Sequence, residues 1–116
     1  MKIAILGAGL MGAKLGRLWA ASGHEVTFAF SRRPARLKAL ADQCGAASGT
    51  VAQALEGADA ALLAVRWAQI DDVLEQAGDM AGLTVLNCSV PLNDADTALV
   101  YGPHTCGAEE LARLRP

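Results

Sequence analysis

The sequence predicts one α/β domain over residues 1–116, built as a Rossmann-type doubly wound parallel sheet between two layers of helices. Apolar, strand-like segments alternate with helix-like segments along the chain, which is the pattern of a parallel sheet with right-handed helical crossovers. The first apolar segment runs directly into a glycine-rich turn and then into a helix. A chain of 116 residues, 53% of them apolar, has material for one hydrophobic core and is too short for a second domain.

The first half of the chain predicts two strand–helix units. The opening strand is apolar, and in the helix after it Leu15, Leu18 and Trp19 recur at helical spacing, which predicts that they share its inner face. Gly23 ends this helix, and the next strand is rich in β-branched and aromatic residues. Pro34 suits the first turn of the second helix. The expected elements are strands at 2–6 and 25–30 and helices at 10–22 and 35–43.

The second half predicts three more strands. The third strand can be only a few residues long, and the short helix after it ends at Gly57. A continuous apolar run bounded by charge follows, as in strands that parallel sheets bury on both faces. The helix after this run has Ile70, Val73 and Leu74 on its inner stripe. The expected elements are strands at 46–47, 59–65 and 83–88 and helices at 50–56, 67–78 and 107–113, with a loop at 89–104.

The segment from Gly7 to Gly12 has the spacing of a dinucleotide-phosphate cradle. Gly7 permits a tight turn out of the strand, Gly9 lets the backbone approach a pyrophosphate, and Gly12 lets the helix pack closely on the strand. The helix then begins with unpaired N–H groups and a partial positive charge, which stabilise an anion without a basic side chain. We assign Gly7, Gly9, Leu10, Met11 and Gly12 to cofactor binding; the alternative is a glycine turn without a ligand.

The end of the second strand indicates which dinucleotide binds. NAD sites usually carry Asp or Glu about 20 residues after the glycine motif, to accept hydrogen bonds from the ribose hydroxyls. Here Ser31 stands 19 residues after Gly12, and Arg32 and Arg33 follow it. Guanidinium groups match phosphate geometry, so these residues predict the 2′-phosphate of NADP. The alternative, two solvated arginines, is disfavoured because cations are unfavourable beside a helix N-terminus.

Ligands of such sheets lie beyond the carboxyl ends of the strands, which selects further residues by position. Ala64, Val65 and Arg66 follow the fourth strand, and Ser89 and Pro91 follow the fifth, so these five residues are also assigned to cofactor binding. The sequence does not identify a catalytic residue. His104 and Cys106 lie beyond the fifth strand, where they could face an acceptor or form only local contacts. His24 precedes a strand, so it is expected in a turn at the opposite edge of the sheet.

Together with the glycine turn and Ser31–Arg33, three segments carry a family resemblance. They are the strand Ala61–Val65, the pair Pro91–Leu92 and the run Gly107–Leu111. Over nearly its whole length the chain resembles the NADP-binding domain of the coenzyme F420-dependent NADP oxidoreductase family. The resemblance implies hydride exchange between NADP(H) and a second small-molecule substrate, the redox acceptor. This co-substrate would be the deazaflavin F420, a flavin or a similar acceptor.

Two positions depart from the family pattern, and they concern the acceptor. The family often has proline where this chain has Arg66, and asparagine where it has Val90. The family's fold also continues with a further strand and a C-terminal region that helps form the acceptor pocket and the dimer. The resemblance therefore implies a homodimer or association with another chain. It also implies that residues 1–116 alone bind NADP more readily than they catalyse a reduction. The alternative function is an NADP(H)-binding sensor or subunit module without its own catalysis.

Composition excludes several other classes of protein. The net charge of −2 indicates neither nucleic acid nor a membrane surface as a partner. Three widely spaced cysteines, without a C-x-x-C pair, predict no disulfide framework and no metal site, and they suit a reducing cytoplasm. No apolar run approaches the length of a membrane span, and the N-terminus lacks signal-peptide features. We therefore expect an untargeted cytoplasmic protein.

Overall fold

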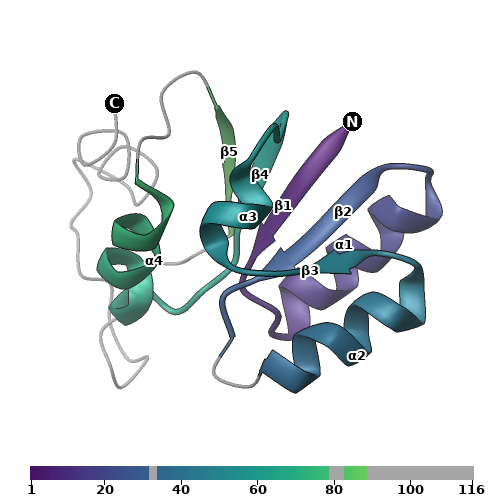
Figure 1. Cartoon of the computed structure of the whole chain (residues 1–116). Coiled ribbons are helices and arrows are strands. Elements are labelled where there is room, and N and C mark those ends of the chain that lie inside the picture. Colours follow the sequence, from purple (N-terminus) through teal and green to yellow (C-terminus); the bar gives the residue numbers. More distant parts are fainter. Residues whose placement is uncertain (32–33, 79–82, 89–116) are drawn as a thin grey trace.

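A computed structural model describes residues 1–31, 34–78 and 83–88, which form a five-stranded parallel sheet with helices on both faces (Figure 1). The elements are β1 Lys2–Leu6, α1 Leu10–Ala21, β2 Glu25–Ala29, α2 Pro34–Cys44, β3 Ala47–Ser48, α3 Val51–Leu55, β4 Ala60–Leu63, the 3₁₀ turn η1 Trp67–Gln69, α4 Ile70–Ala77 and β5 Thr84–Asn87. The strand order is β3-β2-β1-β4-β5. The chain therefore reverses its direction of travel across the sheet between β1 and β4, which confirms the predicted doubly wound fold.

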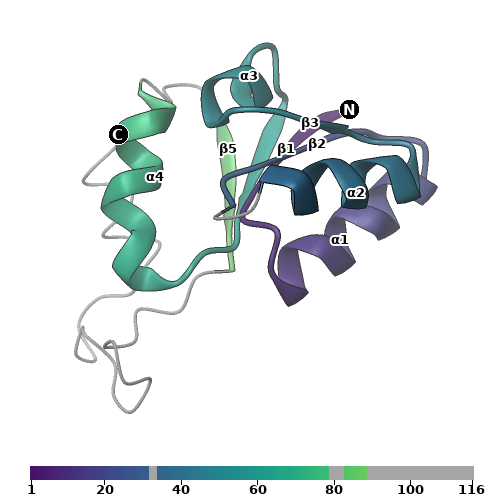
Figure 2. The ribbon, with the colours of Figure 1, turned by 60° about the horizontal axis from the view of Figure 1, so that its bottom comes forward.

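Helices cover the two faces of the sheet separately (Figure 2). Beneath α1 and α2 the core is built around Ile5, Phe28 and Leu62. Beneath α3 and α4 it is built around Leu6 and Leu63. Since adjacent strand residues point to opposite faces, β1 and β4 contribute to both cores. β1 is buried from Ile3 onward, and β4 is buried throughout, as its continuous apolar run predicted.

Most predicted elements are present with shifts of one or two residues at their ends. The third strand begins one residue late because the N–H of Ala46 still donates to the carbonyl of Ala41, which keeps Ala46 in the turn after α2. The expected helix at 67–78 begins as the 3₁₀ turn η1 before it becomes α4. The loop expected at 89–104 and the helix expected at 107–113 lie outside the described residues. Within the described ranges, no helix is long and apolar enough to cross a membrane.

The prediction that Leu18 lies on the inner face of α1 is wrong. Leu18 is 55% exposed, so it does not face the sheet. The buried stripe of α1 instead runs through Gly12 and Gly16, four residues apart, with Leu15 and Trp19 partly buried beside them. The glycine motif had predicted close packing at Gly12, whereas apolar periodicity misplaced Leu18 because the residues closest to the sheet are glycines, which carry no side chain to bury.

Gly16 lets α1 lie against a fully buried aromatic ring. A Cβ at this position would overlap Cε1 of Phe28 and lie 2.5 Å from its Cζ. Phe28 has no exposed surface and therefore has little room to move. We expect Gly16→Ala to destabilise the protein by about 1–3 kcal/mol through overpacking. Thermal unfolding should then show a melting temperature lower by at least about 4 °C.

Helix propensity alone gives the opposite expectation for this substitution. Alanine favours a helix over glycine by roughly 1 kcal/mol, so a rise in melting temperature would contradict close packing at Gly16. A second substitution, Phe28→Leu, shortens the ring side chain that the new methyl group meets. The double variant should lose less stability than the sum of the two single variants, because the residues are in contact.

Candidate functional site

The carboxyl ends of β1, β2 and β4 are joined by backbone hydrogen bonds at the switch point of the sheet. The N–H of Gly7, directly after β1, donates to the carbonyl of Ala29 at 2.9 Å. On the other side, the N–H of Ala64 donates to the carbonyl of Leu6 at 2.9 Å. The glycine turn is thereby fixed between the segments that follow β2 and β4, where ligands of open α/β sheets bind.

Gly7 and Gly12 are required by the packing of the turn itself. Gly7 has a φ of +114°, and a Cβ there would lie 2.8 Å from the carbonyl carbon of Ala64 and 2.9 Å from Cγ1 of Val65. A Cβ on Gly12 would overlap the carbonyl oxygen of Gly7 and lie 3.3 Å from Cγ2 of Ile5. These two glycines hold α1 and β4 close to the turn, whether or not a ligand is bound.

Gly9 has a different environment. A Cβ at Gly9 would meet no protein atom within 4 Å, so the space that a side chain would occupy is open. Gly9 is the N-cap of α1, without a side-chain cap and without an acidic residue in the first turn of the helix. By contrast, α3 is closed by a capping box between Thr50 and Gln53. The N-terminus of α1 thus keeps backbone N–H groups and a partial positive charge for an external anion.

A cavity of about 350 Å³, the glycine-turn cavity, adjoins this helix end. It is lined by Gly7, Ala8, Gly9, Phe30, Ser31, Arg36, Ala64, Val65, Arg66 and Gln69. Six residues assigned from the sequence therefore meet here: Gly7, Gly9, Ser31, Ala64, Val65 and Arg66. Of the other assigned residues, Gly12 packs beneath the turn, Leu10 begins α1, and Met11 is 55% exposed and does not line the cavity.

Four assigned residues lie outside the described part of the chain, and their roles stay predictions. They are Arg32, Arg33, Ser89 and Pro91. The same holds for Val90, His104 and Cys106. His24 lies in the turn between α1 and β2, where its N–H donates to the carbonyl of Trp19. This places His24 at the amino end of β2, away from the cavity, as the sequence predicted.

The sequence reasoning missed Arg36 and Gln69. Arg36 stands in the first turn of α2, three residues after Arg33 in the sequence, and this continuation of the basic segment is the signal that could have identified it. Arg36 and Arg66 are both exposed, and both line the cavity. Among the described residues, none that lines the cavity is acidic. The cavity therefore combines two guanidinium groups with a helix N-terminus, which favours a ligand with separated negative charges.

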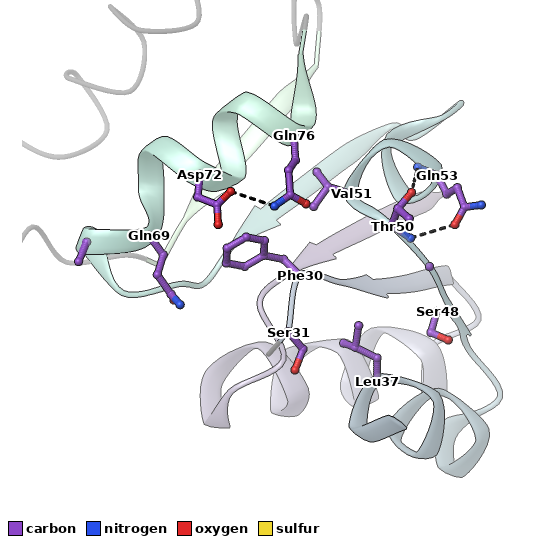
Figure 3. Close-up of a pocket in the computed structure, with 12 residues that line it drawn as sticks. Phe30, Ser31, Leu37, Ser48, Thr50, Val51, Gln53, Gln69, Asp72 and Gln76 are labelled. Atoms are coloured by element: carbon purple, nitrogen blue, oxygen red, sulfur yellow. Dashed lines mark hydrogen bonds between the residues drawn. The ribbon is translucent and has the colours of Figure 1, made fainter. Parts of the chain in front are cut away.

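A second and larger space, the side groove, adjoins the cavity (Figure 3). Its volume is about 780 Å³, and it shares Phe30, Ser31 and Gln69 with the glycine-turn cavity. The remaining lining residues are Leu37, Ser48, Gly49, Thr50, Val51, Gln53, Ala68, Asp72 and Gln76. Asp72 is the one charged residue among the described residues of this lining, and the amide of Gln76 donates to its carboxylate at 3.0 Å. Positive charge thus lines the cavity, and neutral hydrogen-bonding groups dominate the groove.

Comparison with known proteins agrees with this geometry. Residues 2–91 match the model of a family described as NADP oxidoreductase, coenzyme F420-dependent. A hypothetical protein from Sinorhizobium meliloti has 28% identity and a TM-score of 0.83 over 100% of this chain. A candidate F420-dependent NADP reductase from Arthrobacter sp. FB24 shares the fold, with 24% identity and a TM-score of 0.85 over 98% of this chain. No curated protein sequence matches the chain.

A more distant structure carries a bound dinucleotide. The reductive aminase from Aspergillus terreus, solved with NADPH and ethyl levulinate, has 26% identity and a TM-score of 0.68. The match covers 78% of this chain and 32% of the aminase. This chain spans 57% of the length of the Sinorhizobium and Arthrobacter proteins. This chain therefore corresponds to only part of each of these proteins.

Proposed function

The chain belongs to the family of coenzyme F420-dependent NADP oxidoreductases, and we propose that it binds NADP(H) in the glycine-turn cavity for hydride exchange with a deazaflavin, flavin or similar acceptor. The observation that carries the proposal is the pairing of an open approach at Gly9 with an uncapped helix N-terminus and flanking arginines. A dinucleotide phosphate has charges at its pyrophosphate and at its 2′-phosphate. The cavity offers donors for both.

Each group in the cavity has a separate part in binding. The first-turn N–H groups of α1 donate to the pyrophosphate, which can approach because Gly9 has no side chain. Ser31, shortly after β2, and Arg36, in the first turn of α2, donate to the 2′-phosphate, together with Arg32 and Arg33 as predicted from the sequence. Bound NADPH would supply the hydride, so the chain's own task is to orient the nicotinamide and to exclude water.

Association with a second chain is part of the proposal. β5 is an edge strand among the described residues, and Val85 and Leu86 on its two faces are 37% and 46% exposed. An apolar, unpaired edge favours a homodimer or another partner chain. Cys44 and Cys88 are free thiols, which suits a cytoplasmic setting.

One experiment separates this proposal from its alternative. Purified full chain is titrated with NADPH and NADH by nucleotide fluorescence, and its mass is measured by light scattering. The complex is then mixed with F420, FMN, FAD and ferric chelates while oxidation of NADPH is followed. We expect binding that prefers NADPH, followed by oxidation with at least one acceptor. Binding without any turnover would identify a sensor or subunit module instead, and absence of NADPH binding would contradict both functions.

A further inference from the structure

Phe30 has a backbone conformation that is unusual for its residue type. Its φ is +63°, and within the part of the chain that the structure describes it is the only residue other than glycine with a positive φ. Left-handed backbone is disfavoured when a Cβ is present, and it is rare for bulky side chains. Glycine fits such a position without steric cost. A phenylalanine here therefore points to a use for its ring that offsets the strain.

The backbone on both sides of this turn is held in place. The carbonyl of Ala29 accepts a hydrogen bond from the N–H of Gly7 at 2.9 Å, and the carbonyl of Phe28 accepts one from the N–H of Gly49 at 3.1 Å. β2 is thus fixed by the glycine turn on one side and by the segment after β3 on the other. The left-handed turn at Phe30 then brings Ser31 to the boundary between the glycine-turn cavity and the side groove.

The ring of Phe30 forms part of the wall of both spaces. It points toward α4, on the side of Gln69 and Asp72 (Figure 3). The ring packs against the core beneath α3 and α4 but is only partly buried, whereas Phe28, two residues earlier, has no exposed surface. A ring that served only to fill the core would be enclosed as Phe28 is. The exposed part of the ring therefore lies where a ligand can contact it.

The side groove suits a flat, uncharged ligand group with hydrogen-bonding edges. Leu37 and Val51 supply apolar surface, and Thr50 and Gln69 supply neutral polar groups. Arg36 and Arg66 line the cavity and not the groove. In NADP the adenine base and the 2′-phosphate are attached to the same ribose. A 2′-phosphate held at Ser31 and Arg36 would therefore leave the base within reach of Phe30 and the groove.

We propose that Phe30 is a positioning residue for the adenosine half of NADP(H). Its left-handed backbone directs Ser31 toward the 2′-phosphate, and its ring packs against the adenine base at the entrance of the side groove. The inference rests on the proposed NADP(H) binding and adds a residue that the glycine motif and the arginines do not include. Stacking of a base on an aromatic side chain is strong enough to change affinity about tenfold.

Three substitutions separate the ring from the backbone strain. Phe30→Gly and Phe30→Ala both remove the ring. Glycine adopts the left-handed conformation without strain, whereas alanine keeps the strain. Phe30→Tyr keeps an aromatic ring. Dissociation constants are measured for NADPH, for 2′,5′-ADP, which carries the base and the 2′-phosphate, and for reduced nicotinamide mononucleotide, which lacks the adenosine half. Thermal unfolding is recorded for each variant. Leu18→Ala, which removes an exposed apolar side chain from α1, is the control.

The expected pattern is specific to a positioning role. The glycine and alanine variants should both bind NADPH and 2′,5′-ADP about tenfold more weakly, although the glycine variant melts several degrees higher than the alanine variant. The tyrosine variant and the control should bind as the wild type does, and binding of the mononucleotide should not change. Unchanged binding of 2′,5′-ADP by the glycine variant, or affinity losses that follow melting temperature instead of the ring, would overturn the inference.

These outcomes are distinct from a failure of the proposed function. A wild type that binds NADPH and 2′,5′-ADP, with unchanged binding in the glycine variant, contradicts only the role of Phe30. A wild type that binds neither ligand contradicts NADP(H) binding and the role of Phe30 together. Equal losses for the mononucleotide and for 2′,5′-ADP would also overturn the inference, because the ring would then act on the whole site and not on the adenosine half.

Discussion

Gly9→Val is expected to raise the dissociation constant for NADPH by more than about a hundredfold, while the protein remains folded. The valine side chain would occupy the open space through which the pyrophosphate approaches α1, so two or more charge-assisted hydrogen bonds would be lost. Folding should be affected by no more than about 1 kcal/mol, because Gly9 is extended, with a φ of −73°, and no protein atom lies within 4 Å of the added Cβ. Nucleotide titration and thermal unfolding measure the two quantities.

A matched substitution at Gly7 should instead lower the stability of the fold. Gly7→Ala forces a side chain into a backbone with a φ of +114° and against the carbonyl of Ala64. We expect it to destabilise the fold by about 3 kcal/mol or more, since strain and overpacking add. If Gly9→Val keeps the affinity of the wild type in a correctly folded protein, the assignment of this turn to the pyrophosphate is wrong.

Removing the arginines that follow β2, namely Arg32, Arg33 and Arg36, is expected to abolish the preference for NADP(H). Arg36→Ala should weaken NADPH about tenfold, and Arg32→Ala with Arg33→Ala should weaken it by on the order of a hundredfold or more. The reason is that hydrogen bonds to a charged phosphate contribute about 1.5–3 kcal/mol each, and NADH has no phosphate at this position. Arg36 is exposed, so its share should fall as salt is raised.

Arg17→Ala is the control for this series. It removes the same charge from α1, where Arg17 donates to the side chain of Gln43 and does not line the cavity. Dissociation constants for NADPH and NADH are measured at low and moderate salt for every variant. An equal loss for both cofactors, or a wild type that prefers NADH, would show that these arginines do not read a 2′-phosphate.

Local sequence signals were enough to predict the sheet and the glycine turn. The apolar run that became β4 had no polar position to place in solvent, and it is buried on both faces. Gly7 and Gly12 each stand where a missing side chain is required, and both requirements are visible in the spacing of the motif. Among the described residues, Gly7, Ser31 and Ala64 follow three different strands and line one cavity, because parallel strands align their carboxyl ends.

Signals that depend on distant parts of the chain could not be read in this way. Leu18 has the spacing of an inner residue, but α1 is rotated so that Gly16 meets Phe28 and Leu18 faces outward. Gln69 is the last residue of the 3₁₀ turn η1, which follows β4, and this turn brings Gln69 to the cavity. The side groove lies between residues near 30, 50 and 70, which no local pattern connects.

The sequence by itself determined the fold class, the glycine-rich turn after β1 and the positive charge that follows β2 in the chain, because these depend on residue type and spacing within one strand–turn–helix unit. Tertiary structure alone decided that Arg36 and Arg66 line one cavity and that Phe30, with a left-handed backbone, lines both the cavity and the side groove. The physical reason is that the relative placement of segments is set by packing across the sheet, where contacts between residues far apart in the chain outweigh local preference.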